Sequence, residues 1–84
     1  MTPREAIETL LDRGGKAKTI CPSEAARLLA GGDEDWRARM PSVHDAVDML
    51  LAEDRIALSW KGEPKEKRRG PYRIARRFDH SNGP

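Results

Sequence analysis

Apolar residues recur at helical spacing near the start of the chain, between residue types that are typical of helix ends. Thr2 is suited to cap a helix, Pro3 suits the first helical position, and Glu5 completes a capping box. The glycine pair Gly14-Gly15 ends the pattern, since glycine readily takes the left-handed conformation that closes a helix. We predict a first helix between these signals, with an apolar stripe formed by Ala6, Ile7, Leu10 and Leu11.

Two further helices are predicted from the same kind of signal. One starts at Cys21-Pro22, with Glu24 placed to accept a hydrogen bond from the Cys21 backbone N–H, and stops at Gly31-Gly32. The other extends from about Pro41 to Asp54, because proline favours an extended backbone at the residue before it. Their buried faces are predicted to be Ala25, Ala26, Leu28 and Leu29 in one helix, and Val43, Val47, Leu50 and Leu51 in the other.

Other positions in this region are also assigned from the pattern. Trp36 is predicted to anchor the core, and residues 16–20 are short enough to pair as a minor strand. The face of the third helix opposite its apolar stripe is acidic and is expected to be solvated; it carries Ser42, His44, Asp45 and Asp48.

After Asp54 the period changes from 3.6 residues to 2. Ile56, Leu58 and Trp60 alternate with polar or small residues, which is typical of a strand with one buried face. Residues 62–70 have the composition of a loop, and residues 71–78 alternate again. We therefore predict a two-stranded hairpin with a long basic loop.

Three helices followed by such a hairpin indicate an α+β fold, a winged helix-turn-helix whose two-stranded β-hairpin is the wing. The domain is expected to span residues 1–78, with a disordered tail at 79–84. A two-stranded hairpin is marginally stable alone, so it must pack on the helices. The competing topology is a three-helix bundle with a disordered basic tail, which leaves the alternation on both arms unexplained.

Length and composition exclude several classes of protein. A chain of 84 residues is one domain or less, and 37% hydrophobic against 36% charged residues is typical of a globular domain. No apolar run approaches the ~18 residues of a membrane span, and the first residues lack the order of a secretion signal, so we expect a cytoplasmic protein. A single cysteine, Cys21, excludes an internal disulfide.

Charge is distributed unevenly along the chain. Residues 1–54 carry seven Lys or Arg against eleven Asp or Glu, whereas residues 55–84 carry nine against three. The net charges are therefore −4 and +6, and such a split indicates a polar partner at the basic end, either nucleic acid or an acidic protein. A merely solvated basic tail is the alternative.

Three segments of the chain also resemble a known family. Residues 20–27 (ICPSEAAR), 36–41 (WRARMP) and 70–73 (GPYR) are similar to a family of small bacterial proteins known only as a domain of unknown function. The resemblance covers roughly residues 6–76 and implies a winged-helix fold. It implies no activity. This chain departs from the family after Pro41, where Ser42, His44 and Asp45 stand in place of more basic residues. For that reason we do not expect the third helix to recognise bases.

The leading functional hypothesis is a domain that binds nucleic acid, most simply duplex DNA with weak sequence specificity, through phosphate contacts of its wing. The alternative is a protein-interaction module that does not bind nucleic acid. Oligomeric state is left open. The residues expected to contact phosphates are Arg37, Arg39, Lys61, Lys65, Lys67, Arg68, Arg69, Arg73 and Arg76.

Other candidate chemistry is weaker. Trp60 and Tyr72 suit either base stacking or packing beneath the hairpin, and packing is the more ordinary role. Cys21 at a helix N-terminus suits a reactive thiol, but a free cysteine is more often a small buried apolar residue. His44 and His80 do not form a metal set with other residues, and the sequence holds no recognisable catalytic constellation. We expect neither a cofactor nor enzymatic activity.

Overall fold

The computed structural model describes residues 1–14, 19–32 and 35–77. Capping hydrogen bonds fix where its first two helices begin. At the start of α1 (Pro3–Gly14), the Thr2 N–H donates to Glu5 Oε1 at 2.7 Å and the Glu5 N–H donates to Thr2 Oγ1 at 3.1 Å. At the start of α2 (Pro22–Ala30), the Cys21 N–H donates to Glu24 Oε2 at 2.6 Å. The two predicted capping contacts are confirmed.

The third helix differs slightly from its prediction. A 3-10 helix, η1 (Asp35–Arg39), leads directly into α3 (Met40–Ala52), so Met40 is helical rather than extended. Pro41 is tolerated there because the first N–H groups of a helix have no intrahelical acceptor. The helix ends two residues before the predicted Asp54, which adopts the left-handed conformation with φ 59°.

The sheet has three strands where two were predicted. Strands β1 (Ile56–Trp60), β2 (Glu63–Lys65) and β3 (Arg73–Arg76) are antiparallel in the order β2-β1-β3. The chain reverses directly after Trp60, because Lys61 and Gly62 have φ values of 53° and 82°, the left-handed pair of a type I′ turn. Part of the expected loop therefore forms a strand, with Trp60 opposite Glu63.

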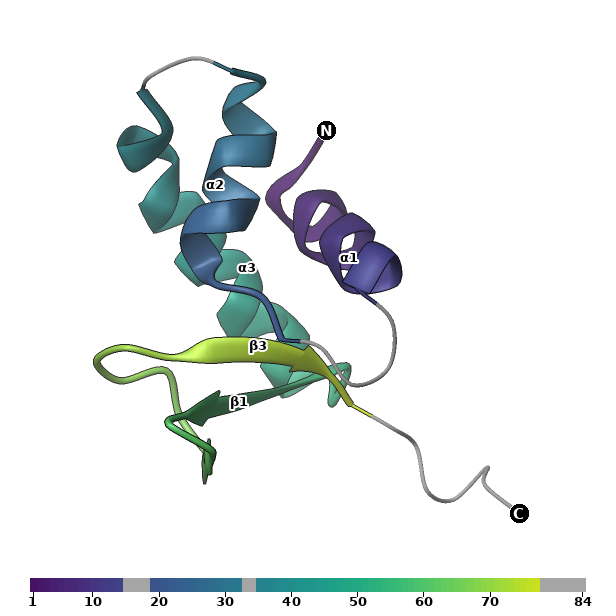
Figure 1. The fold of residues 1–84 in the computed structure, drawn as a ribbon, viewed down its shortest axis with the longest axis vertical. Helices are drawn as coiled ribbons and strands as arrows, with labels where there is room; N and C mark the ends of the chain where they lie inside the picture. Colours follow the sequence, from purple (N-terminus) through teal and green to yellow (C-terminus); the bar gives the residue numbers. More distant parts are fainter. Residues whose placement is uncertain (15–18, 33–34, 78–84) are drawn as a thin grey trace.

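Because β2 and β3 flank opposite edges of β1, residues 66–72 must cross from one edge of the sheet to the other; we call them the crossing segment. Figure 1 shows it as the loop before β3, at the same end of the sheet as the end of β1. On the outer edge of β3, Ile20 and Ile74 exchange two backbone hydrogen bonds of 2.8 Å. Of the predicted minor strand, the described residues show one isolated bridge at Ile20, and residues 16–18 lie outside the described residues.

One apolar core joins the helices to the inner face of the sheet, and the helices lie together on one side of the strands (Figure 1). Trp36 is only partly buried against this core. Trp60 is 39% exposed, so the prediction that it packs beneath the hairpin is wrong. The buried members of the core are Ala6, Ile7, Leu11, Ile20, Ala25, Ala26, Val43, Ala46, Val47, Leu50, Ile56, Leu58, Tyr72 and Ile74.

Two remaining predictions concern residues that the structure does not describe. The tail at residues 79–84 and the last residue of the expected domain, Phe78, lie outside it. Within the described residues, the helices are too short and too polar to cross a bilayer.

The turn between β1 and β2 makes the first testable prediction. A non-glycine residue in the left-handed region costs about 1–2 kcal/mol, and asparagine tolerates that region better than lysine. Lys61→Asn is therefore expected to raise the free energy of unfolding by about 0.5–1 kcal/mol in urea titrations. Lys61→Ala removes the same charge without relieving the backbone, so a similar gain in that control would contradict this explanation.

Candidate nucleic-acid interface

Several cations of the basic C-terminal part are neutralised by carboxylates of the acidic N-terminal part. Arg55 lies 3.0 Å from Glu53 and 3.6 Å from Glu8, and Arg68 lies 2.9 Å from Asp48. Two more pairs join Arg76 to Asp12 and Arg77 to Asp54. Within the described residues, four of the nine Lys and Arg after residue 54 thus form ion pairs with the first part of the chain, and the charge split is partly complementary within the fold.

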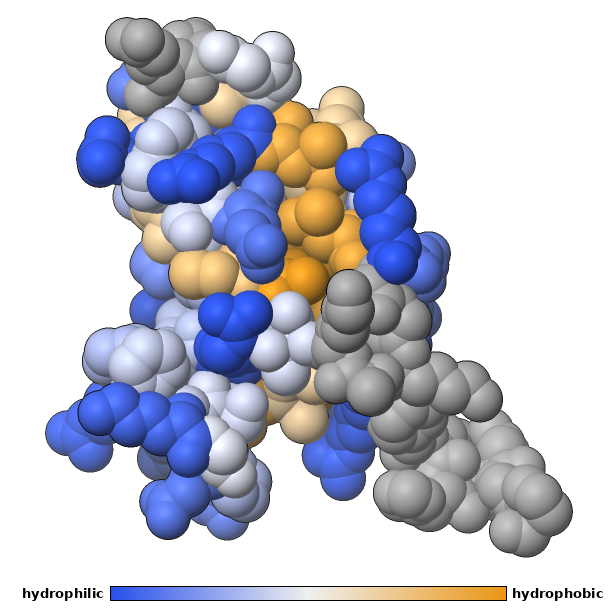
Figure 2. Space-filling model, viewed as in Figure 1, coloured by the Kyte–Doolittle hydropathy of each residue, from blue (hydrophilic) through white to orange (hydrophobic). Residues whose placement is uncertain are grey.

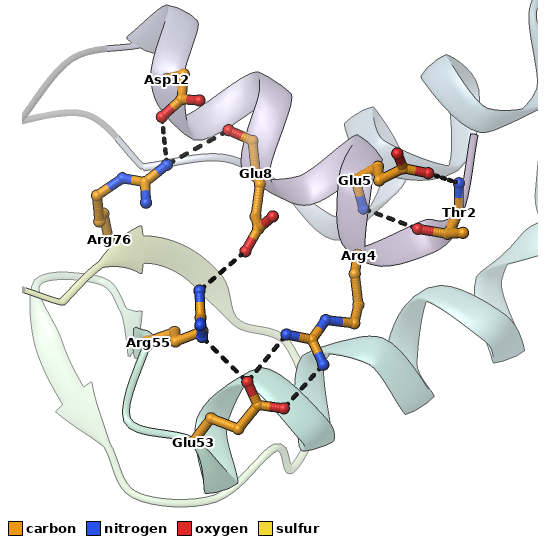
Figure 3. Close-up of polar contacts among 8 residues, drawn as sticks. All are labelled: Thr2, Arg4, Glu5, Glu8, Asp12, Glu53, Arg55 and Arg76. Carbon is orange, nitrogen blue, oxygen red and sulfur yellow. Dashed lines mark hydrogen bonds and ion pairs between the residues drawn. The ribbon is translucent and has the colours of Figure 1, made fainter.

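Arg76, a predicted phosphate contact, belongs to the polar network drawn in Figure 3. Its guanidinium donates to the Asp12 carboxylate and to the backbone carbonyl of Glu8, which ties β3 to α1. In the same network Arg4 donates two hydrogen bonds, of 2.8 and 2.9 Å, to Glu53, and the hydrogen bond from Arg4 holds the pKa of Glu53 below its usual value. Because the Arg76 guanidinium donates to groups of α1, Arg76 contributes to the fold.

Two contacts attach the crossing segment to α3, and we call them the clamp. Arg68 donates from Nε and Nη2 to the two carboxylate oxygens of Asp48, at 2.9 and 3.0 Å. The Tyr72 hydroxyl lies 2.6 Å from His44 Nδ1 in a hydrogen bond. Hydrogen bonding to Arg68 lowers the pKa of Asp48, and burial raises the pKa of Tyr72 to about 12. The face of α3 that was expected to be solvated is therefore partly covered.

Two other predicted contacts also use their donors internally. The Lys65 ammonium donates to the carbonyl oxygens of Arg69 and, at 3.0 Å, of Pro71, which braces the crossing segment from β2. Arg73 donates from Nε to Thr19 Oγ1 at 2.6 Å and from Nη2 to the Thr19 carbonyl at 3.1 Å. Neither residue has a carboxylate partner among the described residues, so both still add positive charge to the sheet.

Three predicted residues in and beside the sheet remain unengaged. Lys61, Lys67 and Arg69 are exposed, and their side chains form no hydrogen bond or ion pair with another residue of the described chain. All three come from the β1–β2 turn or the crossing segment, at the end of the sheet that Figure 2 shows as strongly hydrophilic. We call these three side chains the basic end. Arg39 in η1 is likewise exposed and forms no side-chain hydrogen bond or ion pair with another described residue, so these four predicted cations are available to an anionic partner.

Arg37 and Arg39 lie elsewhere. They belong to η1, which lies against α2 in the upper part of Figure 1, away from the sheet. Arg37 Cζ is 4.4 Å from the centroid of the Trp36 ring, and Arg27 Cζ from α2 is 4.7 Å from it. These distances are those of cation–π contacts, which hold both guanidinium groups beside the indole. The structure therefore does not bring η1 together with the basic end.

The remaining candidate chemistry can be assigned briefly. Cys21 is partly exposed, rather than fully buried, and its sulfur accepts a hydrogen bond of 3.1 Å from the Ser23 hydroxyl. His44 serves the clamp, and His80 lies outside the described residues. Among the residues that the structure describes, no three His, Cys, Asp or Glu side chains are arranged to hold a metal ion.

The clamp makes the second prediction. The side chains of Arg68 and Asp48 are 31% and 50% exposed, and exposed ion pairs contribute up to about 1 kcal/mol, with bidentate geometry at the upper end. A double-mutant cycle of Asp48→Ala and Arg68→Ala in urea is expected to give a coupling energy of about 0.5–1 kcal/mol. The matched cycle with Asp45→Ala, an acid on the same helix that is not hydrogen-bonded to Arg68, is expected to give a much smaller value. Equal couplings would contradict a specific clamp.

His44 makes a prediction for pH. Burial, followed by the nearby Arg68 charge, lowers the pKa of His44 below its ordinary value of 6.5, although Asp48 and Asp45 oppose this shift. The unfolded chain therefore takes up a proton before the folded chain does. The stability that depends on neutral His44 is complete above pH 6.5 and is lost as pH falls through the lower folded pKa.

The free energy of unfolding should consequently decrease between about pH 7 and pH 5, and His44→Gln should flatten this decrease. Urea titrations at several pH values measure both slopes. His80 is present in both proteins and cancels from the comparison. An unchanged slope in the variant would show that His44 is not the titrating group.

Comparison with known proteins identifies a family and nothing on function. No curated protein matches the chain. The model of the family described as "Protein of unknown function (DUF3253)" matches residues 2–77, from the residue before α1 to the residue after β3. This confirms the resemblance to a family of unknown function that the sequence indicated. The chain belongs to the DUF3253 family.

Proposed function

We propose that this chain is a winged-helix domain that binds nucleic acid through phosphate contacts at its basic end. The order of elements supports the fold: three helices, a short pairing after α1, and antiparallel strands that follow α3 directly. The observation that carries the function is the availability of Lys61, Lys67 and Arg69, which are exposed and unengaged beside a sheet whose other cations are committed. Each phosphate that such a cation neutralises releases counterions, and this release favours binding.

The crossing segment is suited to present these charges. Arg68, which lies between the exposed Lys67 and Arg69 in the chain, attaches the segment to α3. Lys65 attaches the segment to β2. Side chains on a fixed segment lose less conformational freedom when they bind than side chains on a free loop. The contacts are to phosphate, so the binding is expected to depend little on base sequence.

Groove reading by α3 is not part of this proposal. In many winged helices the third helix enters the major groove, but here the clamp covers part of the face that carries His44 and Asp48. Asp45 on the same helix is exposed and would lie against phosphates or acceptor groups of the bases. The wing is therefore the main contact, with Arg37 and Arg39 as a separate, secondary one.

One observation favours the alternative of a protein-interaction module. Figure 2 shows apolar side chains gathered along the junction of α2 and α1, in the upper part of the view and away from the hydrophilic end of the sheet. A surface of this kind suits a protein partner better than nucleic acid. Absence of nucleic-acid binding at low salt would favour this second function.

The salt dependence of binding tests the proposal quantitatively. The logarithm of the binding constant falls with the logarithm of salt concentration with a slope of about −0.9 per phosphate on duplex DNA. The three cations of the basic end alone predict a slope of about −3, whereas all nine residues expected from the sequence would give about −8. Fluorescence anisotropy with a labelled duplex at several salt concentrations measures this slope.

Charge variants identify the surface. Lys67→Ala with Arg69→Ala should weaken binding and make the slope shallower by about 2. Arg13→Ala, which removes an exposed charge from α1, should change the slope much less than Arg69→Ala does. A steep slope that is insensitive to the basic end would assign the binding to other cations.

A further inference from the structure

An exposed aromatic side chain stands beside the basic end. Trp60 is 39% exposed, although it is a large apolar residue at the end of a central strand. It pairs with Glu63 across the two-residue turn and directly precedes Lys61. Its backbone is thus fixed by the sheet while its side chain is partly open to solvent, next to an unengaged cation.

The other described large aromatic residues are committed. Tyr72 is 4% exposed, and its hydroxyl forms a hydrogen bond with His44 Nδ1. Trp36 is partly buried against the core, and two guanidinium groups lie within 4.7 Å of its ring centroid. Among the described residues, Trp60 is therefore the large aromatic side chain best placed to receive another flat group.

We propose that the ligand of the basic end is single-stranded nucleic acid, with one base stacked on Trp60 while Lys61, Lys67 and Arg69 contact the flanking phosphates. The inference rests on the proposed function and names its ligand class. Proteins that bind single strands combine aromatic platforms with a positively charged track, because each base has a flat face that is open only when the strand is unpaired. Figure 1 places the end of β1 and the crossing segment at the same end of the sheet, which is the juxtaposition that this binding mode needs.

The limited number of available cations points the same way. Duplex-binding winged helices add contacts of the third helix in the groove to those of the wing, and here the clamp covers part of that helix. Three phosphate contacts alone give weak binding at physiological salt. Stacking of one base strengthens binding by about fivefold to a hundredfold, which is the contribution that a small basic surface lacks.

Two variants with a single tryptophan isolate the signal. Trp36→Phe leaves Trp60 as the only indole, and Trp60→Phe leaves Trp36. The probes are a short oligothymidylate, an abasic oligonucleotide with the same number of phosphates, and a duplex of the same length. Oligothymidylate is expected to quench the fluorescence of the Trp36→Phe protein, and to leave the Trp60→Phe protein nearly unchanged.

Affinities in the otherwise unaltered protein give an independent measurement. Trp60→Ala is expected to weaken oligothymidylate binding by about tenfold, and Trp60→Phe, which retains a ring, by less. The abasic strand should bind the unaltered protein about as weakly as oligothymidylate binds Trp60→Ala. Because Trp60 is not a member of the core, circular dichroism melting curves of the variants should remain close to that of the unaltered protein.

The possible failures are distinguishable. Equal affinity for the oligothymidylate and the abasic strand, with a normal salt slope, would overturn stacking on Trp60 and leave phosphate binding intact. Tighter binding of the duplex than of the single strand would overturn the ligand class. No binding of any probe at low salt would overturn the proposed function together with this inference.

Discussion

The attachment of the crossing segment to α3 is the interaction on which the arrangement of the charged surface depends. Because β2 and β3 lie on opposite sides of β1, residues 66–72 must span one end of the sheet whatever their composition. The clamp and the hydrogen bonds of Lys65 hold the segment in one course. That course covers part of α3 and turns the remaining cations outwards. A loop without these contacts would leave this face of α3 exposed to solvent, and the positions of the loop's own charges would not be fixed.

The same arrangement changes what the charge split means. A basic half and an acidic half within one chain indicate a partner only if the fold does not bring them together. Here Arg55, Arg68, Arg76 and Arg77 each form an ion pair with a carboxylate from residues 1–54. Each exposed pair adds little stability. Two of these four, Arg68 and Arg76, belong to the set that was expected to contact phosphates.

The sequence predicts the helical part of this fold well, because capping depends on residues three positions apart. Thr2 with Glu5 and Cys21 with Glu24 form the expected hydrogen bonds. The third strand was missed because Lys61-Gly62 is a weaker turn signal than Asn-Gly. The clamp was missed because positions 48 and 68 are joined only by the course of the crossing segment, which no local pattern encodes. The predicted site consequently includes cations whose side chains the structure ties to other residues, and the exposure of Trp60 was not foreseen.

Lys61 connects the turn to the proposed binding surface. A lysine in the left-handed conformation opposes the local preference of its turn, which asparagine or glycine would satisfy at lower cost. Departures from local preference are expected at functional sites, where a side chain serves something other than the fold. At this position the side chain is exposed, is unengaged within the described chain and follows Trp60. The fold gives no reason for a lysine there, whereas the proposed phosphate contact beside a stacked base would give one.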